Sequence, residues 1–590
     1  MTIFKKLIFL LTPREKKQSG LLMLMIIIMA FLDMIGVASI LPFMTVASNP
    51  DIVDKNNILN TMFQTSKNFG VENTYDFLIV LGALVFVLLI ISLTFKALTT
   101  YVQVRFIQML EYSIGRRLLK GYLMKPYVWF LSENSSDIGK TILSEVQEIT
   151  SRGISSLVKI INHGMIIFAI IILLIASNVK LAFTIFVTLG GSYLLIFYLV
   201  KKLLNNIGEA RLKNNELRFK FVNEAFGAAK EVKIGGLENI YLNNFSEAAK
   251  NYAKSKATAG LISKLPRFFL EALSFGGILL LIIYSMALLG NLNTFLPTIS
   301  LYVYAGYRLL PALQQVYSAS TQLRFVDLSL DRIYQDLKKL NVSETKKALS
   351  NCKPISLEKL ISLKNISFTY PGSTRLIIKN LNLNISANTT VGIIGSTGSG
   401  KTTTIDIMLG LLEAQKGKLE VDGQEITNFN LKSWQKSIGY VPQYIYLSDD
   451  TIASNIAFGI DTKSIDYNQI KKVAKIANLH DFVEKELPEK YQTIIGERGT
   501  RLSGGQRQRI GIARALYGKP KVLILDEATS SLDNETEKVV VDAIDNLDKK
   551  ITIIMIAHRL NTIKKCDVIF KLDKGNLINS GTYNEIVNSN

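Results

Sequence analysis

The sequence predicts an all-α, six-helix membrane domain in residues 1–340, a linker in residues 341–355 and an α/β domain in residues 356–590. Three observations carry this prediction. Apolar stretches long enough to cross a bilayer occur six times before residue 320. From about residue 354 onward, short β-branched strands alternate with helical stretches, as in α/β domains. A glycine-rich turn joins one of these strands to the helix that follows it.

The composition supports residence in a membrane. Of the 590 residues, 48% are hydrophobic and 20% are charged, which is too apolar for a disordered chain and unusual for a soluble enzyme. Residues 1–340 carry 35 basic and 21 acidic side chains, and residues 341–590 carry 33 and 27, so the excess positive charge lies mainly on the apolar half. No basic patch is interleaved with aromatic residues, and we expect no nucleic-acid partner. Two isolated cysteines, Cys352 and Cys566, argue against a disulfide framework and a zinc site.

The N-terminal residues Phe4 to Leu11 resemble a signal-peptide core, but no small-residue cleavage site follows them. Thr12 as N-cap, Pro13 at the first helical position and Glu15 at the third predict that a new helix begins here. We therefore expect the N-terminal segment to be retained as an amphipathic helix in the membrane interface.

The apolar stretches are joined by connections of very unequal length. The connections after the second and fourth stretches run for tens of charged, helix-forming residues, and basic residues concentrate in them and at the N-terminus, which places them in the cytoplasm. Breaks at residues 130–137 and 227–236, the latter with Gly235 and Gly236, predict that each long extension turns back. The stretches are Leu21–Val46, Phe77–Phe95, Ile154–Ala176, Leu181–Val200, Phe268–Leu289 and Phe295–Tyr317.

Three basic side chains lie at similar depth near the cytoplasmic ends of their stretches: Lys96, Arg267 and Arg308. If they face one cavity, they form a site for an anionic head group, because low-dielectric walls strengthen the attraction to phosphate. The alternative is that Lys96 and Arg267 extend to the interface and Arg308 pairs with Glu271. Asp33, in the middle of the first stretch, is either a polar helix contact or a gate.

One external connection, from Ser48 to Asp76, is longer than the others. The apolar residues within 52–63 could gather on one face of a short helix in the outer interface. Such a helix either meets a lipid tail or shields the rim of the bundle.

The glycine-rich turn of the α/β domain has the spacing of a P-loop. The strand Thr390–Ile394 leads into it, and a helix follows from Thr403. In such a loop the backbone N–H groups surround phosphates, Lys401 reaches the β- and γ-phosphates, and the Thr402 hydroxyl binds Mg²⁺. We therefore expect ATP and Mg²⁺ as cofactors, bound by the turn together with Thr403. The turn consists of Gly395, Ser396, Thr397, Gly398, Ser399, Gly400, Lys401 and Thr402.

Catalytic candidates follow two later apolar strands. Asp526 ends the strand that begins at Val522 and suits the water shell of Mg²⁺, and Glu527 could polarise the attacking water. His558 follows the strand Thr552–Ile556 and could hold the γ-phosphate and that water, although a buried structural histidine is the alternative. We interpret the two other histidines, His163 and His480, as structural.

The run Leu502, Ser503, Gly504, Gly505 and Gln506 matches the ABC signature. With it, residues 354–590 resemble an ABC transporter nucleotide-binding domain, and the whole chain resembles an ABC exporter half-transporter.

The resemblance implies roles for further residues. Tyr370 matches the position that stacks on adenine, and Gln443 lies in the Q-loop, which joins Mg²⁺ and water to the membrane domain. Residues 496–499 resemble the exporter X-loop and residues 531–533 the D-loop, in which Asp533 belongs to the nucleotide site. In this family the signature of one domain caps the ATP held by the P-loop of another. Because the chain has one of each, we expect a homodimer, with a heterodimer as the alternative.

Parts of the membrane half resemble the bacterial lipid-linked oligosaccharide flippases. The similar parts are the end of the first stretch at Leu41–Phe43, the external segment 52–63 and the surroundings of Arg267 and Arg308. The resemblance implies pyrophosphate-binding arginines at Arg267 and Arg308. Lys96 stands where a third arginine is expected, and a lysine keeps the charge but loses the planar bidentate fork.

The resemblance therefore predicts an ATP-driven transporter of an amphipathic anionic substrate in a bacterial cytoplasmic membrane. A polyprenyl-diphosphate-linked oligosaccharide is the favoured substrate, so that membrane lipid and a lipid-linked saccharide are expected partners. The alternatives are an exporter of lipid A, drugs or peptides and, from another class, a non-transport ABC ATPase that gates or regulates a membrane partner.

Overall fold

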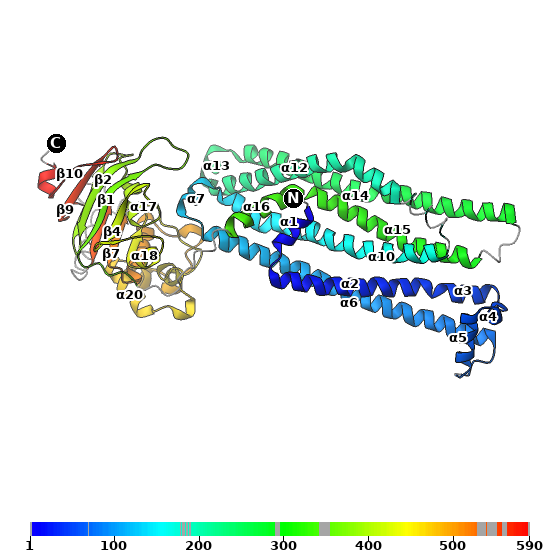
Figure 1. The fold of residues 1–590 in the computed structure, drawn as a ribbon. Coiled ribbons are helices and arrows are strands. Elements are labelled where there is room, and N and C mark those ends of the chain that lie inside the picture. Colours follow the sequence, from blue (N-terminus) through cyan, green and yellow to red (C-terminus); the bar gives the residue numbers. More distant parts are fainter. Residues whose placement is uncertain are drawn as a thin grey trace. The chain divides into compact units, whose positions relative to one another are not determined.

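The computed structural model describes residues 3–68, 70–177, 190–289, 296–341, 354–527, 551–556 and 563–587, with isolated positions between them. The chain forms two compact units. One comprises Met1–Lys125 and Glu133–Lys346, and the other comprises Pro126–Ser132 and Lys347–Asn590. The first is helical, and the second contains two β-sheets (Figure 1).

The first unit consists of long helices and short connecting ones. Two of the long helices, α6 with 50 residues and α14 with 52, extend for roughly 75 Å or more at 1.5 Å per residue, far beyond the ~20 residues that cross a bilayer. Helices of this length leave residues to spare beyond a bilayer, and their extension into the cytoplasm stays a prediction. The helices are α1 (Ile3–Leu10), α2 (Pro13–Ala38), α3 (Ile40–Ser48), α4 (Ile52–Lys55), α5 (Asn57–Lys67), α6 (Thr74–Leu123), α8 (Ser135–Lys140), α9 (Val146–Glu148), α10 (Ser155–Ser177), α12 (Gly191–Gly227), α13 (Ala229–Gly235), α14 (Glu238–Leu289), α15 (Leu296–Phe325) and α16 (Asp327–Asn341).

Three helical stretches of the described chain are long and apolar enough to span a membrane: Pro13–Ser48, Thr74–Leu123 and Ser135–Ala176. They contain the first three predicted stretches. The predicted fifth stretch lies in α14, and the sixth lies in α15 from Leu296 onward. Of the fourth, residues 191–200 begin α12, and most of residues 181–189 lie outside the described part of the chain.

The third span is entered through two π-helical turns, Thr141–Glu145 (η1) and Ile149–Ile154 (η2), which lie between α8 and α10. π-turns interrupt the ordinary i→i−4 hydrogen bonding and each accommodates one extra residue. The α-helical pattern resumes at Ser155.

The start of α2 confirms the predicted capping box. The Glu15 backbone N–H donates to Thr12 Oγ1 at 3.3 Å, and the Thr12 N–H donates to Glu15 Oε2 at 2.8 Å. The preceding helix α1 buries Leu7 and Leu10, and the Phe9 ring lies 4.9 Å from that of Tyr334 in α16. Figure 1 shows α1 beside α16. The helix is therefore packed on one side, with Phe4 and Ile8 exposed on the other.

Both long extensions turn back near the predicted breaks, although α6 already ends at Leu123, before the first predicted range of 130–137. The first passes from α6 through α7 (Tyr127–Ser132) to α8. The second passes from α12 to α13, which ends at Gly236 with φ of 60°, a left-handed conformation that glycine adopts without steric cost. Helix α7 belongs to the second compact unit, where Val128 packs against the hydrophobic core.

The external segment favours the interpretation as a shield. Leu59 and Phe63 of α5 are buried together with Val46 and Val53, and the Phe63 ring lies 5.3 Å from the ring of Phe77 in α6. The apolar face of this short helix is therefore occupied by its own bundle.

The second unit contains a four-stranded antiparallel sheet, order β2-β1-β4-β5, and a six-stranded sheet, order β10-β9-β3-β8-β7-β6. In the larger sheet only β10 runs antiparallel to its neighbour. The strands are β1 (Leu360–Phe368), β2 (Ile378–Ser386), β3 (Thr390–Gly395), β4 (Lys416–Val421), β5 (Gln424–Glu425), β6 (Ile438–Val441), β7 (Val522–Asp526), β8 (Thr552–Ile556), β9 (Val568–Asp573) and β10 (Asn576–Gly581).

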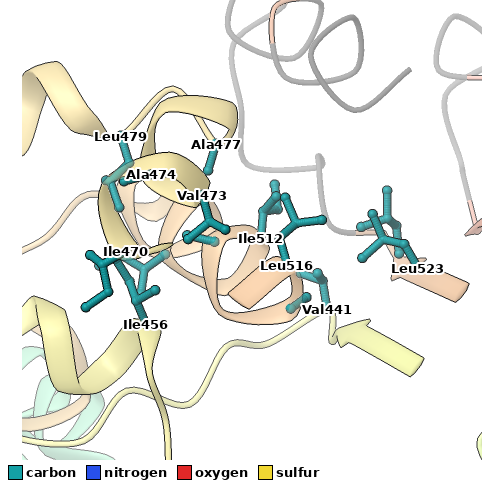
Figure 2. Close-up of a cluster of buried hydrophobic side chains, with 14 of the residues drawn as sticks. Val441, Ile456, Ile470, Val473, Ala474, Ala477, Leu479, Ile512, Leu516 and Leu523 are labelled. Carbon is teal, nitrogen blue, oxygen red and sulfur yellow. The ribbon is translucent and has the colours of Figure 1, made fainter. Parts of the chain in front are cut away.

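Helices α19 to α22 share a hydrophobic cluster with strands of the larger sheet. Figure 2 shows Val473 of α20 beside Ile512 of α22, in the cluster that also includes Val441 of β6 and Leu523 of β7. This packing fixes the N-terminus of α22 relative to the ends of the central strands. The helices are α17 (Lys401–Met408), α18 (Leu431–Gln435), α19 (Ile452–Ile456), α20 (Tyr467–Ile476), α21 (His480–Glu486), α22 (Gly504–Tyr517) and α24 (Tyr583–Val587), and the 3₁₀ turns are η4 (Thr462–Ser464), η5 (Lys490–Gln492) and η6 (Glu497–Gly499).

Candidate functional site

The predicted phosphate loop joins the central strand β3 to helix α17. Its conformation is fixed from inside, because the Lys401 ammonium donates to the carbonyl oxygens of Gly395 at 2.9 Å and Ser396 at 3.1 Å. Lys401 is only 7% exposed. The loop therefore holds its lysine curled within its own backbone, at the N-terminus of a helix that attracts anions.

The loop requires glycine at several positions for steric reasons. A Cβ at Gly395 would clash with the backbone carbonyl oxygen of Leu572 in the adjacent strand β9. Gly398 and Gly400 have φ of 79° and 101°, in the left-handed region that disfavours residues with a Cβ. Thr397 lies between these positions and is exposed. The sequence spacing thus produces a turn that only glycines form without strain.

The loop contains an orphaned polar atom. The Ser399 Oγ is buried and has no hydrogen-bond partner among the described residues, and the residue is 1% exposed. A buried hydroxyl without a partner is costly, and a bound anion would satisfy it. This supports phosphate as the ligand of the cradle.

Two carboxylates lie at the end of β7. Burial raises the pKa of the Asp526 carboxyl, and the adjacent Glu527 charge raises it further, whereas Tyr440 and Lys401 act in the opposite direction. Burial lowers the pKa of the Lys401 ammonium, while Glu527 and Asp526 oppose that shift. The lysine and both carboxylates therefore form one electrostatic group.

The predicted base and the Q-loop residue are in contact. The Gln443 side-chain amide donates to Glu527 Oε2 at 2.7 Å. Glu527 follows its strand with φ of 51°, and its backbone N–H donates to the Ile556 carbonyl at the end of β8. This turn aims the Glu527 carboxylate away from the strand and toward Gln443.

The oxygen-rich set fits Mg²⁺, a hard cation that prefers oxygen ligands and retains several waters. Thr402 at the start of α17 is exposed, and the Gln443 amide and Asp526 carboxylate supply oxygens from two other segments. When bound, Mg²⁺ would neutralise charge on the phosphates. Thr402, Gln443 and Asp526 are the residues of this chain that would hold it, Asp526 through water.

The predicted adenine-stacking residue, Tyr370, contacts α17, the helix that follows the phosphate loop. The Tyr370 hydroxyl lies 3.1 Å from Thr403 Oγ1, and its ring meets that of Phe368 edge-on at 5.0 Å. Both contacts hold Tyr370 close to the base of the phosphate loop.

The signature run forms the N-terminus of α22. Ser503 is the N-cap, its hydroxyl oxygen accepts from the Gln506 N–H at 3.2 Å, and the Ser503 N–H donates to Gln506 Oε1 at 2.8 Å. This capping box is a role that the sequence analysis missed for Gln506, although the serine-to-glutamine spacing signals it. Gly504 and Gly505 open the helix, whose N-terminal N–H groups can bind an anion.

Arg514 of α22 was also missed. Its guanidinium donates to the Tyr446 carbonyl at 2.8 Å and the Asn455 carbonyl at 2.8 Å, and it lies 4.6 Å from the Phe458 ring. Burial lowers the pKa of Arg514 to about 10. Arg514 thus ties the signature helix to the segment that follows Gln443. The signal was a single arginine within the small and apolar run 510–516.

Two predicted residues cannot be placed. His558 and Asp533, with its neighbours Ser531 and Leu532, lie outside the residues that the structure describes. Their roles remain predictions.

In the first unit, two of the three predicted cations share a carboxylate. Lys96 Nζ lies 3.8 Å from Asp33 Oδ2, and Arg308 Nη1 lies 3.6 Å from Asp33 Oδ1. Arg267 instead pairs with Glu271 on its own helix, at 2.5 Å. The alternative pairing of Arg308 with Glu271 was therefore wrong, because Glu271 is taken by the residue one helical turn before it. Asp33 is a buried contact between helices, as one of its two interpretations held.

Comparisons with known proteins agree with this architecture. Residues 378–530 match the ABC transporter family, and residues 55–306 match the ABC transporter transmembrane region. The chain is 31% identical, over 80% of its own length and 81% of the relative's, to an ATP-dependent lipid A-core flippase of Wigglesworthia glossinidia brevipalpis. It is 41% identical to the multidrug resistance protein pgp-1 of Caenorhabditis elegans over 38% of this chain and 17% of that protein.

A solved structure supports the fold. A bacterial Atm1-family ABC exporter with ATP bound has a TM-score of 0.78, 23% identity and coverage of 97% of both chains. The fold and the nucleotide site define an ATP-hydrolysing membrane transporter. The chain belongs to the ABC exporter family, as a half-transporter with fused membrane and nucleotide-binding domains, and it couples ATP hydrolysis to transport.

Proposed function

We propose that the chain is a homodimeric flippase that moves an amphipathic, anionic lipid across a bacterial cytoplasmic membrane, with a polyprenyl-diphosphate-linked oligosaccharide as the favoured substrate. The observation that carries this proposal is the convergence of Lys96 and Arg308, from two different spans, within 4 Å of one buried carboxylate. Among the described residues this pair of cations has Asp33 as its one anionic partner, so it retains net positive charge, which favours an anionic head group.

Relatives named lipid A-core flippases support a lipid as cargo. They also keep lipid A itself as a second candidate, since a phosphorylated saccharide lipid presents the same combination of charge and chain. The multidrug relative matches 38% of this chain, so it bears less on the cargo.

The proposed cycle begins at the nucleotide site. ATP binds to the P-loop of one copy and is capped by Ser503 and the N-terminus of α22 in the other, so that both sites require both chains. Glu527 accepts a proton from the attacking water, while Gln443, which donates to the Glu527 carboxylate at 2.7 Å, keeps that carboxylate in position. Closure and reopening of the two sites then alternate access to the cavity.

The test is translocation in vesicles. The purified chain is reconstituted with a fluorescent undecaprenyl-diphosphate-linked saccharide, and ATP-dependent loss of the label from one leaflet is measured. We expect the double variant Lys96→Gln, Arg308→Gln to lose transport. Arg105→Gln, which removes an exposed arginine of α6, is the matched control and should retain it.

Thermal unfolding of the full chain in detergent reports whether each variant is folded. Transport by the double variant at the wild-type rate would exclude these two cations from the substrate site. Equal transport of an uncharged polyprenol-linked saccharide would exclude an anionic substrate.

A further inference from the structure

Asp33 occupies the centre of the proposed head-group site, and its own contacts are incomplete. The residue is 2% exposed in α2, and among the described residues one hydrogen bond holds it, from the Ser92 hydroxyl of α6 to Asp33 Oδ1 at 2.8 Å. Asp33 Oδ2 is buried and has no hydrogen-bond partner among the described residues. A buried carboxylate oxygen of this kind is costly, and nearby positive charge is what stabilises it.

The two cations around Asp33, Lys96 and Arg308, form no short ion pair with its carboxylate. Their distances to Asp33, 3.8 Å for Lys96 and 3.6 Å for Arg308, are longer than the ~2.7–2.9 Å of a charge-assisted hydrogen bond. Arg308 Nε is buried without a partner in the part of the chain described here, and the Lys96 side chain is 37% exposed. The Arg308 guanidinium lies 5.9 Å from the Tyr304 ring, and among the described residues Asp33 is its one ion-pair partner.

The local charge follows from these contacts. One carboxylate faces two cations that come from α6 and α15, so the cluster has a net charge of about +1 when His163 is neutral. His163 of α10 lies within electrostatic range of Lys96 and Asp33, so four helices contribute to the cluster. An anionic group entering here meets two attractive charges and one repulsive charge.

We infer that Asp33 is an internal competitor for the anionic head group, a specificity-determining residue that sets how strongly Lys96 and Arg308 bind phosphate. This inference rests on the proposed function. The carboxylate engages both cations loosely, so a phosphate with more oxygens and more charge displaces it, whereas a neutral or weakly anionic group does not. Asp33 thereby raises the threshold for binding and restricts the site to strongly anionic lipids.

The test measures dissociation constants of two probes, undecaprenyl phosphate and undecaprenol, for the full chain in detergent, by native mass spectrometry. Asp33→Asn removes the competing charge but keeps an oxygen that accepts from Ser92. We expect it to tighten undecaprenyl phosphate binding at least about tenfold, because one unit charge at about 4 Å changes affinity by about fivefold in bulk water and by several hundredfold at an effective dielectric constant of about 20. Binding of undecaprenol should not change.

A charge-matched series provides the controls. Lys96→Gln reduces the local charge to zero and should weaken phosphate binding by a similar factor. The double variant Asp33→Asn, Lys96→Gln restores a charge of about +1 and should bind undecaprenyl phosphate nearly as the wild type does. If Asp33→Asn alone is unstable, because its two cations repel each other, the comparison of Lys96→Gln with the double variant gives the same answer.

The outcomes separate the two proposals. If the wild type binds undecaprenyl phosphate no better than undecaprenol, both the proposed function and this inference are overturned. If the wild type prefers the phosphate but Asp33→Asn binds it equally or more weakly in both backgrounds, only the role of Asp33 is overturned. A purely structural role would lower thermal stability and weaken both probes together.

Discussion

In the nucleotide-binding unit the Lys401 ammonium donates to two backbone carbonyl oxygens at 2.9 and 3.1 Å, whereas in the membrane unit the Lys96 ammonium lies 3.8 Å from one side-chain oxygen. The partners of Lys401 lie five and six residues away, within one turn of the chain. The partners in the membrane cluster come from α2, α6 and α15. A cradle made by local backbone is preorganised, and a cluster made by side chains from separate helices can readjust as the helices move. The nucleotide site is therefore a fixed site with preorganised geometry, whereas the membrane cluster is an adjustable site whose geometry can change during transport.

The largest expected effect is a loss of ATP hydrolysis at the fixed site, which is the nucleotide site. Glu527→Gln removes the proposed base but keeps an acceptor for Gln443, so ATP hydrolysis should fall by more than about 100-fold while ATP remains bound. Phosphate release and nucleotide binding are measured on the same sample. Glu489→Gln, at an exposed position of the same unit, is the control. Sustained hydrolysis by Glu527→Gln would show that another residue is the base.

The second prediction compares the two lysines directly. Lys401→Arg should lower kcat/KM for ATP by about 100-fold, because a planar guanidinium cannot fit a cradle that surrounds a compact ammonium. Lys96→Arg should change undecaprenyl phosphate binding by less than about threefold, since its surroundings are open and the charge is kept. Equal sensitivity at the two positions would contradict the contrast between a fixed and an adjustable site.

The third prediction tests how rigid the phosphate loop is. Gly395→Ala places a Cβ against the Leu572 backbone carbonyl, which cannot move without disturbing the pairing of β3 with β9, so it should cost about 3 kcal/mol of stability and weaken ATP binding. Gly398→Ala meets no atom within 4 Å and bears only the strain of its φ of 79°, about 1 kcal/mol. Thermal unfolding and ATP titration measure both. Similar losses of stability and ATP affinity for the two variants would contradict this prediction and indicate a loop whose backbone adjusts.

The smallest expected effect concerns the buried carboxyl group of Asp406, beside the nucleotide site. Burial, and then the Asp526 charge, raises the pKa of Asp406 in α17 to about 6. The unfolded chain ionises this carboxyl at lower pH, so the folded state loses stability as pH rises from about 4 to about 6. Asp406→Asn should therefore raise the free energy of unfolding by about 1 kcal/mol at pH 8 and by less at pH 5. Differential scanning fluorimetry at the two pH values checks this, and an equal gain at both would contradict it.

Features encoded within a few residues could be predicted from the sequence. The capping box of Thr12 and Glu15, the left-handed stop at Gly236 and the strand-turn-helix around Lys401 all depend on neighbours in the chain. The contact between Gln443 and Glu527 could be expected because both follow strands that end at the same edge of a parallel sheet, although 84 residues separate them.

Pairings between helices could not be predicted in the same way. Arg308 and Asp33 are far apart in sequence, and the choice between Asp33 and Glu271 depends on which helix faces which, a matter of tertiary packing. Arg514 illustrates the same limit, since its acceptors are carbonyl oxygens of Tyr446 and Asn455, and backbone acceptors carry no residue-type signal.

The two π-turns before α10 have a practical consequence for reading this span. One extra residue rotates everything downstream by about 100° around the axis, and two rotate it by about 200°. A helical wheel drawn without interruption from Ser135 to Ser177 would therefore assign residues such as His163 to nearly the opposite side of the cylinder. Cysteine-labelling or crosslinking sites in this segment should be chosen from a helical wheel that starts at Ser155.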